Sequence, residues 1–128
     1  MVKRYFQRLY NMIHSRGHVE IELLDFDELS DRQGSVEGRL AFVDGSVLVF
    51  DEVFLLRNRQ IAKLRYAYHY QDDAGQLIFR YDNAPHFPNL PTYPDHKHVG
   101  PRVEPTLAPD LGDVLREIDE LIFGINMG

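Results

Sequence analysis

The sequence predicts an α+β fold: a curved antiparallel meander sheet of four to five strands with an N-terminal and a C-terminal helix. Three observations support this prediction. Apolar residues recur at helical spacing over 3–16 and 111–123. Between these segments the pattern shortens to the alternation typical of strands, and turn residues separate the alternating runs. All seven prolines fall between residues 85 and 109, so the sheet is expected to end there.

The first helix is indicated by one apolar face and a stop signal. Phe6, Leu9, Tyr10 and Ile13 share that face, and Gly17 follows the last turn. The next alternating runs predict strands over 18–26, 36–43, 46–56, 60–71 and 76–83.

Turn and cap residues mark the boundaries of the later elements. Hairpin turns are predicted at Asp44-Gly45, at Asn58-Arg59 and over 72–75, which makes the sheet a meander. Asp110 is suited to cap the last helix, and the acidic Asp113 in its first turn favours the helix dipole.

The last predicted hairpin has an aromatic face and a charged face. Alternation from the turn at 72–75 predicts the aromatic pairs Tyr70–Leu77, Tyr68–Phe79 and Tyr66–Tyr81. The opposite face is predicted to pair Ala67 with Arg80 and Arg65 with Asp82, and to carry Lys63 and His69. A two-residue turn at Asn58-Arg59 would place Glu52 on the other side of Arg65. Arg65 would then lie between two carboxylates, those of Glu52 and Asp82.

Length and composition indicate one domain over 1–128, with a proline-rich strap at 85–109. The net charge of -6 argues against nucleic-acid binding through bulk electrostatics, although a local basic patch is compatible with it. The chain has no cysteine, which excludes disulfides, thiolate metal sites and cysteine nucleophiles. No apolar run approaches the length of about 18 residues that crosses a bilayer, so we expect a soluble, cytoplasmic protein.

The strap opens with prolines at every third position, which favours polyproline II. Histidines lie at both of its ends, and zinc bound by His86, His96 and His98 is one interpretation. A straight polyproline II segment would separate His86 from His96 by roughly 31 Å. These histidines can share an ion only if the strap bends, and otherwise no cofactor is expected.

Metal-independent acid/base chemistry on RNA is a second interpretation. Imidazoles at His86, His96 and His98 titrate near neutrality, and cations can stabilise a developing phosphorane. The candidate catalytic residues are His86, His96, His98, Asn83, Asp82, Arg80 and Arg65. The candidate substrate-binding residues are Lys97, Tyr93, Lys63 and His69.

The alternative function is that of a non-catalytic protein-binding module. In polyproline II, Phe87, Leu90 and Tyr93 fall on one apolar edge, so the segment 85–98 would be the docking surface. Glycine-rich phosphate loops, a nucleophile elbow and a zincin helix are absent from the sequence.

The stretch KLRYAYHYQDDAGQLIFRYDNAPHFPNLPTYPDHKH, Lys63 to His98, resembles the TumE-type toxins. The similarity extends more loosely to GRLAFVDGS (38–46) and to DVLREIDELI (113–122). The resemblance implies the toxin half of a type II toxin–antitoxin pair, without an established chemical mechanism. Phe87 and Asp95 stand where the family pattern has histidines, which shifts weight to the remaining candidates: Asp82, Asn83, His86, His96 and His98.

Membership in such a family would also define the partners. The resemblance implies a cognate antitoxin protein, usually DNA-binding, and we expect an RNA substrate. A homodimer is a further expected form, and no membrane is expected as a partner.

Overall fold

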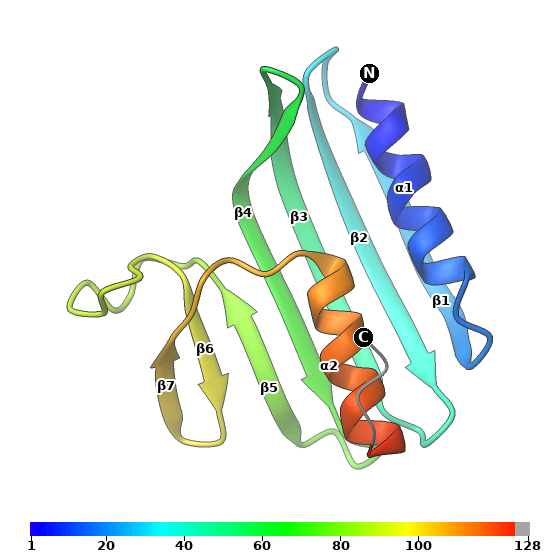
Figure 1. The fold of residues 1–128 in the computed structure, drawn as a ribbon, viewed down its shortest axis with the longest axis vertical. Helices are drawn as coiled ribbons and strands as arrows, with labels where there is room; N and C mark the ends of the chain where they lie inside the picture. The colour runs from blue at the N-terminus through cyan, green and yellow to red at the C-terminus, as the bar shows by residue number, and fades with distance from the viewer. Residues whose placement is uncertain (125–128) are drawn as a thin grey trace.

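Seven antiparallel strands form one sheet in strict chain order in the computed structural model of the protein, which describes residues 1–124 (Figure 1). In chain order the elements are α1 (Val2–His14), β1 (Val19–Glu28), β2 (Gln33–Phe42), β3 (Val47–Arg57), β4 (Gln60–Gln71), β5 (Leu77–Asp82), β6 (His96–Val99), β7 (Arg102–Pro105) and α2 (Leu111–Phe123). The predicted α+β class, the antiparallel meander and the two helices are therefore confirmed.

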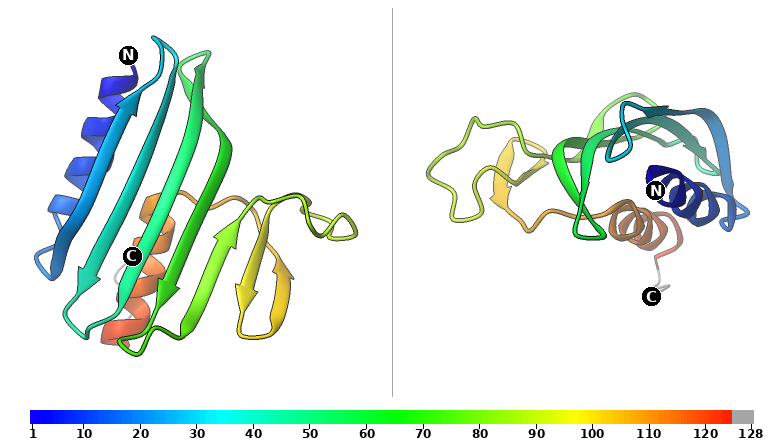
Figure 2. Two further views of the ribbon diagram at one scale, coloured as in Figure 1. Left: turned by 180° about the vertical axis from the view of Figure 1, so that it is seen from behind. Right: turned by 90° about the horizontal axis from the view of Figure 1, so that it is seen from above.

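Both helices lie on the concave face of the curved sheet, which we call the inner face (Figure 2). The opposite, convex surface is called the outer face. Apolar residues of α1, α2 and the inner face form the core, and three tyrosines, Tyr66, Tyr68 and Tyr70, are almost fully buried in it. The core thus lies on the inner side of the sheet, and neither helix covers the outer face.

The strand count is higher than predicted because the proline-rich segment contains a hairpin. β6 and β7 lie between Pro94 and Pro105, and Gly100 adopts the left-handed conformation in their turn, with φ of 58°. Proline lacks a backbone donor and is tolerated here only because Pro105 ends the edge strand β7. The interpretation of this stretch as the end of the sheet was wrong.

The loop between β5 and β6 also departs from the predicted straight course. Successive turns bring the backbone N–H groups of Leu90, Tyr93 and Asp95 to carbonyl oxygens three residues earlier, at 3.2, 3.1 and 3.0 Å. The chain therefore folds back, and His96 pairs with Asp82 across the ladder. The extended polyproline II segment is replaced by a compact loop.

The β4–β5 hairpin has the predicted aromatic face but a different register. Its loop is one residue longer than the two-residue alternative, since the N–H of Asp72 donates to the carbonyl of Gln76 at 2.9 Å. A bulge after Tyr70 adds a second residue of shift, so Asp82 lies opposite Ala67 and the predicted Arg65–Asp82 pair is wrong. A shift of two residues preserves the alternation, which is why the aromatic residues still face the core.

A single-residue bulge has the opposite effect between β3 and β4. The two-residue turn at Asn58-Arg59 is confirmed, with Arg57 paired to Gln60 and both turn residues at positive φ. Beyond it, the ladder shifts by one residue between Val53 and Phe54. Glu52 then lies opposite Tyr66 and is fully buried, so the prediction that it flanks Arg65 was wrong.

Because of the same bulge, the Lys63 side chain lies on the inner face, toward the helices, whereas the Arg65 side chain lies on the outer face. Lys63 Nζ lies 3.6 Å from a carboxylate oxygen of Glu52 and donates to the carbonyl oxygen of Pro109 at 2.8 Å. The predicted grouping of Lys63 with Arg65 and His69 is therefore wrong.

The C-terminal helix begins as predicted. The carboxylate of Asp110 accepts from the N–H of Asp113 at 2.7 Å, and the Asp113 carboxylate accepts from the N–H of Asp110 at 3.0 Å. This capping box satisfies two backbone donors at the helix start. Within residues 1–124, neither helix combines the length and the apolar character that a membrane span requires.

Candidate functional site

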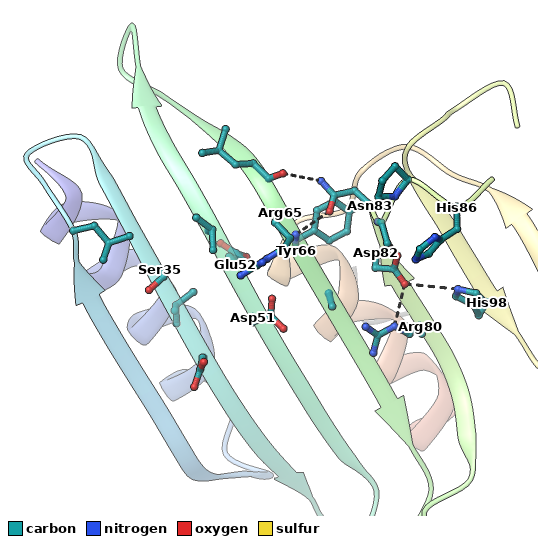
Figure 3. Close-up of a pocket in the computed structure, with 18 residues that line it drawn as sticks. Ser35, Asp51, Glu52, Arg65, Tyr66, Arg80, Asp82, Asn83, His86 and His98 are labelled. Carbon is teal, nitrogen blue, oxygen red and sulfur yellow. Dashed lines mark hydrogen bonds and ion pairs between the residues drawn. The ribbon is translucent and has the colours of Figure 1, made fainter. Parts of the chain in front are cut away.

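A cavity of about 870 Å³ lies on the outer face, between the sheet and the start of the β5–β6 loop (Figure 3). Two arginines and two histidines from different segments line it: Arg65 of β4, Arg80 of β5, His86 of the loop and His98 of β6. The acidic residues Glu37, Asp51 and Asp82 line it as well. The strands alternate, so residues at every second position of β5 and β6 share this face. The cavity is therefore built by non-local pairing rather than by one sequence motif.

Asp82, His96 and His98 form a cluster at one end of the cavity. The β5–β6 ladder pairs Asp82 with His96 and Arg80 with His98, which places all four side chains on the outer face. Phe87 of the loop packs edge-on against His96 and His98, with ring centroids 4.8 and 5.9 Å apart. Phe87, which stands where the family pattern has a histidine, thus packs over both imidazoles. Its ring is therefore not available as a separate docking group.

The Asp82 carboxylate is 5% exposed and is held by several partners. Its Oδ1 accepts from the N–H of Ala84 at 3.0 Å, and its Oδ2 accepts from Arg80 Nε at 3.0 Å. His98 Nε2 lies 3.7 Å from Oδ2, a contact drawn in Figure 3. The neighbouring N–H and guanidinium groups compensate for the burial of this charge.

His96 is 1% exposed and its two ring nitrogens have different surroundings. Nδ1 lies 3.0 Å from the carbonyl oxygen of Pro94 and must donate to it, because a carbonyl oxygen only accepts. Nε2 lies 3.0 Å from Asp82 Oδ1. The two atoms meet the distance for an ion pair but not the alignment of a hydrogen bond, and among residues 1–124 this nitrogen has no hydrogen-bond partner.

The electrostatic setting lowers the pKa of two imidazoles on this face, those of His98 and His69. Burial lowers the pKa of His98, and the charges of His96 and Arg80 add to this effect while Asp82 opposes it. Burial also lowers the pKa of His69, whose Nδ1 lies 3.3 Å from Arg80 Nη1. The guanidinium of Arg80 therefore disfavours a second positive charge beside it.

A second acidic residue of the cavity, Asp51 of β3, interacts electrostatically with Arg65 and Arg80. Burial raises the pKa of Asp51, and both arginines counteract this rise. Arg80 is already paired to Asp82, whereas the part of the chain that the structure describes offers Arg65 no carboxylate within 4.0 Å. Arg65 is thus the cavity cation that is freest to meet an anion. Asp51 was not among the sequence candidates, and alternation along β3 is the signal that could have found it.

The remaining sequence candidates lie elsewhere or have structural partners. Asn83 accepts from the N–H of Tyr66 at 3.1 Å and donates to the carbonyl of Leu64 at 3.2 Å, which extends the β4–β5 ladder past the end of β5. Lys97 lies on the inner face, where its Nζ donates to Glu117 of α2 at 2.7 Å.

Tyr93 is 45% exposed on the β5–β6 loop and does not line the cavity. Lys63 and Lys97 are therefore separated by the sheet from His86 and His98.

The inner face carries a buried polar cluster that sequence reasoning missed. Both oxygens of Glu52 accept from tyrosine hydroxyls, Tyr5 at 2.5 Å and Tyr68 at 2.5 Å, and Lys63 donates to the Tyr68 hydroxyl. Burial, followed by the negative charge of Glu52, raises the pKa of Tyr68 well above its ordinary value. The partners come from α1, β3 and β4, so only the assembled core could reveal them.

The fold and the cavity together define a small α+β protein whose antiparallel meander carries two helices on one face and a polar candidate site on the other. The family model described as Toxin TumE matches residues 6–122. The chain belongs to this toxin family, as the resemblance over 63–98 implied. No curated protein and no solved structure matches the chain.

Proposed function

We propose that this toxin acts on RNA, and that the outer-face cavity is the site where a phosphodiester binds. The observation that carries the proposal is the convergence of Arg65, Arg80, His86 and His98 on one cavity from four separate segments. The charge of Arg65 complements a phosphodiester anion, Arg80 offers further guanidinium donors beside its pairing with Asp82, and an exposed imidazole is a general base.

The roles follow from exposure and pairing. Arg65 and Arg80 bind the phosphate oxygens and stabilise the charge that develops on them. The exposed His86 takes the proton from the ribose 2′-hydroxyl, whose oxygen then bonds to phosphorus while the bond to the 5′-oxygen breaks. Solvent protonates the departing 5′-oxygen. His96 takes no part in proton exchange with RNA because it is 1% exposed.

The acidic net charge of -6 fits a toxin that spends its stable state in a complex. A basic, DNA-binding antitoxin would complement this charge and cover the cavity.

Induction of the chain in bacteria tests this function, with growth and RNA integrity followed in parallel. We expect His86→Ala and Arg65→Ala each to relieve growth arrest and RNA fragmentation together. His14→Ala on α1 and Arg57→Ala at the end of β3 are matched controls, since both residues are exposed and lie outside the cavity. Arrest that persists in both cavity variants would overturn the proposal.

The docking alternative is supported by one observation, the exposure of Tyr93 on the β5–β6 loop. Under this alternative, Tyr93→Ala relieves the arrest and His86→Ala leaves it intact. Phe87→Ala does not separate the two functions, because Phe87 packs against His96 and His98.

A further inference from the structure

We propose that Asp82, His96 and His98 form a binding site for one divalent transition-metal ion, with Zn²⁺ as the best match. This site does not rest on the proposed action on RNA. It is inferred from the geometry of the cluster and from the ring nitrogen of His96 that has no hydrogen-bond partner within residues 1–124.

The potential ligand atoms are close enough for a common ion. One oxygen of Asp82 and one ring nitrogen from each histidine all lie within 4.8 Å of one another. Two separations involve different oxygens of the carboxylate: His96 Nε2 lies 3.0 Å from Asp82 Oδ1, and His98 Nε2 lies 3.7 Å from Asp82 Oδ2. Ligands about 2.0–2.1 Å from a tetrahedral zinc are separated by roughly 3.3 Å, a value between these two.

His96 supplies the observation that calls for a cation. Its Nδ1 donates to the carbonyl oxygen of Pro94, so Nε2 is the ring atom that faces the cluster. Nε2 lies 3.0 Å from Asp82 Oδ1 without the alignment of a hydrogen bond, and among residues 1–124 it has no hydrogen-bond partner. The ring is 1% exposed, so solvent is a poor substitute for that partner. A cation bound by Nε2 and the carboxylate would supply the missing partner.

The surroundings have the features of a supported metal site. A metal-bound histidine usually donates its second ring nitrogen to a carbonyl or carboxylate, as His96 does to Pro94. The Asp82 oxygens accept from Ala84 and Arg80, which fixes the carboxylate while each oxygen keeps a further lone pair. Phe87 packs against both imidazoles on the loop side.

The cluster leaves room for a further ligand on the cavity side. His98 is 28% exposed at its side chain and lines the cavity, whereas His96 and Asp82 are buried. Three protein ligands with an open position are the arrangement of catalytic rather than structural zinc. The open position would be taken by water or by an anion in the cavity.

Donor chemistry selects the ion. Two imidazole nitrogens and one carboxylate suit Zn²⁺, Co²⁺ and Ni²⁺, whereas Mg²⁺ and Ca²⁺ prefer oxygen ligands. The guanidinium of Arg80 shares the Asp82 carboxylate at 3.0 Å and opposes a second cation there. We therefore expect a weaker site than one with an unshared carboxylate.

The test is a titration of the purified, chelator-treated chain with Zn²⁺ by calorimetry, and with Co²⁺ by visible absorption. We expect one equivalent of Zn²⁺ to bind, Co²⁺ to show the bands of a low-coordinate nitrogen–oxygen site, and Mg²⁺ not to compete. Loss of an outer-shell partner already weakens metal sites by about 10–100-fold, so His98→Ala and Asp82→Asn should each weaken Zn²⁺ binding at least that much. His98 is preferred to His96 for substitution because it is partly exposed, and circular dichroism verifies the fold of each variant.

Two controls separate this proposal from the action on RNA. His14→Ala on α1 should leave Zn²⁺ binding unchanged, and so should His86→Ala, which lies outside the three-ligand cluster. A chain that binds no Zn²⁺ above the background of His98→Ala would overturn the metal site and leave the RNA test untouched. Binding in His86→Ala with loss of toxicity would support both proposals independently.

Discussion

Replacing Glu52 by alanine should reduce the free energy of unfolding by about 3–5 kcal/mol, the cost of removing one partner of a buried charge pair. Glu52 is 0% exposed and accepts hydrogen bonds from Tyr5 and Tyr68 at 2.5 Å each. A hydrogen bond to a charged group contributes about 1.5–3 kcal/mol, so two such bonds reach the same range. Lys63, with 14% of its side chain exposed, would lose the carboxylate 3.6 Å away.

Urea unfolding followed by circular dichroism measures this loss. With a slope of about 1–3 kcal/mol/M, the midpoint for Glu52→Ala should fall by at least about 1 M. Glu52→Gln should cost less, because its amide oxygen can still accept from one tyrosine. Glu28→Ala, at the exposed end of β1, is the matched control and should change stability by less than about 0.5 kcal/mol. A loss below about 1 kcal/mol for Glu52→Ala would refute the view that this cluster is a stabilising part of the core.

Three further outcomes follow from single contacts. Gly38→Ala should cost about 1–3 kcal/mol in the same assay, since its Cβ would lie 2.2 Å from the ring of the buried Phe50; an unchanged midpoint would contradict the packing. Asp110→Ala should cost about 1 kcal/mol and lower Tm through loss of the α2 cap, and an unchanged Tm would argue against the cap. Burial and the hydrogen bond to Glu117 raise the pKa of Tyr81 from 10.0 to about 12, so the folded state favours the protonated phenol. Its contribution to stability is complete below pH 10.0 and is lost as the pH rises toward about 12, and Tyr81→Phe should flatten that decline in urea titrations at alkaline pH.

Local patterns were sufficient to predict the helices and the class of fold. The apolar stripe predicted over 111–123 matches α2, and the cap at Asp110 is present. The turn at Asn58-Arg59 is also present, because positive φ at two successive residues depends on local chemistry. These features depend on neighbours within a few residues, which one sequence displays directly.

The register of the sheet could not be predicted to the same degree. A bulge of one residue in β4 placed Lys63 on the inner face and Arg65 on the outer face, although the two share parity in the sequence. Bulges form where cross-strand packing favours them, and the local sequence pattern of 60–71 does not indicate where a bulge lies. Prolines at 94 and 105 likewise obscured β6 and β7, which are stabilised by pairing with β5 and with each other.

The sequence by itself determined which side chains were candidates for the site: Asp82, His86, His96 and His98 stand in one short stretch with a specific family pattern. Only the tertiary structure decided that they meet. The β5–β6 loop folds back and pairs Asp82 with His96, so a segment that would span tens of ångströms when extended brings its two ends to one cavity. The physical reason is that strand pairing is a non-local interaction, whose partners are selected by the packing of the whole sheet rather than by the residues between them.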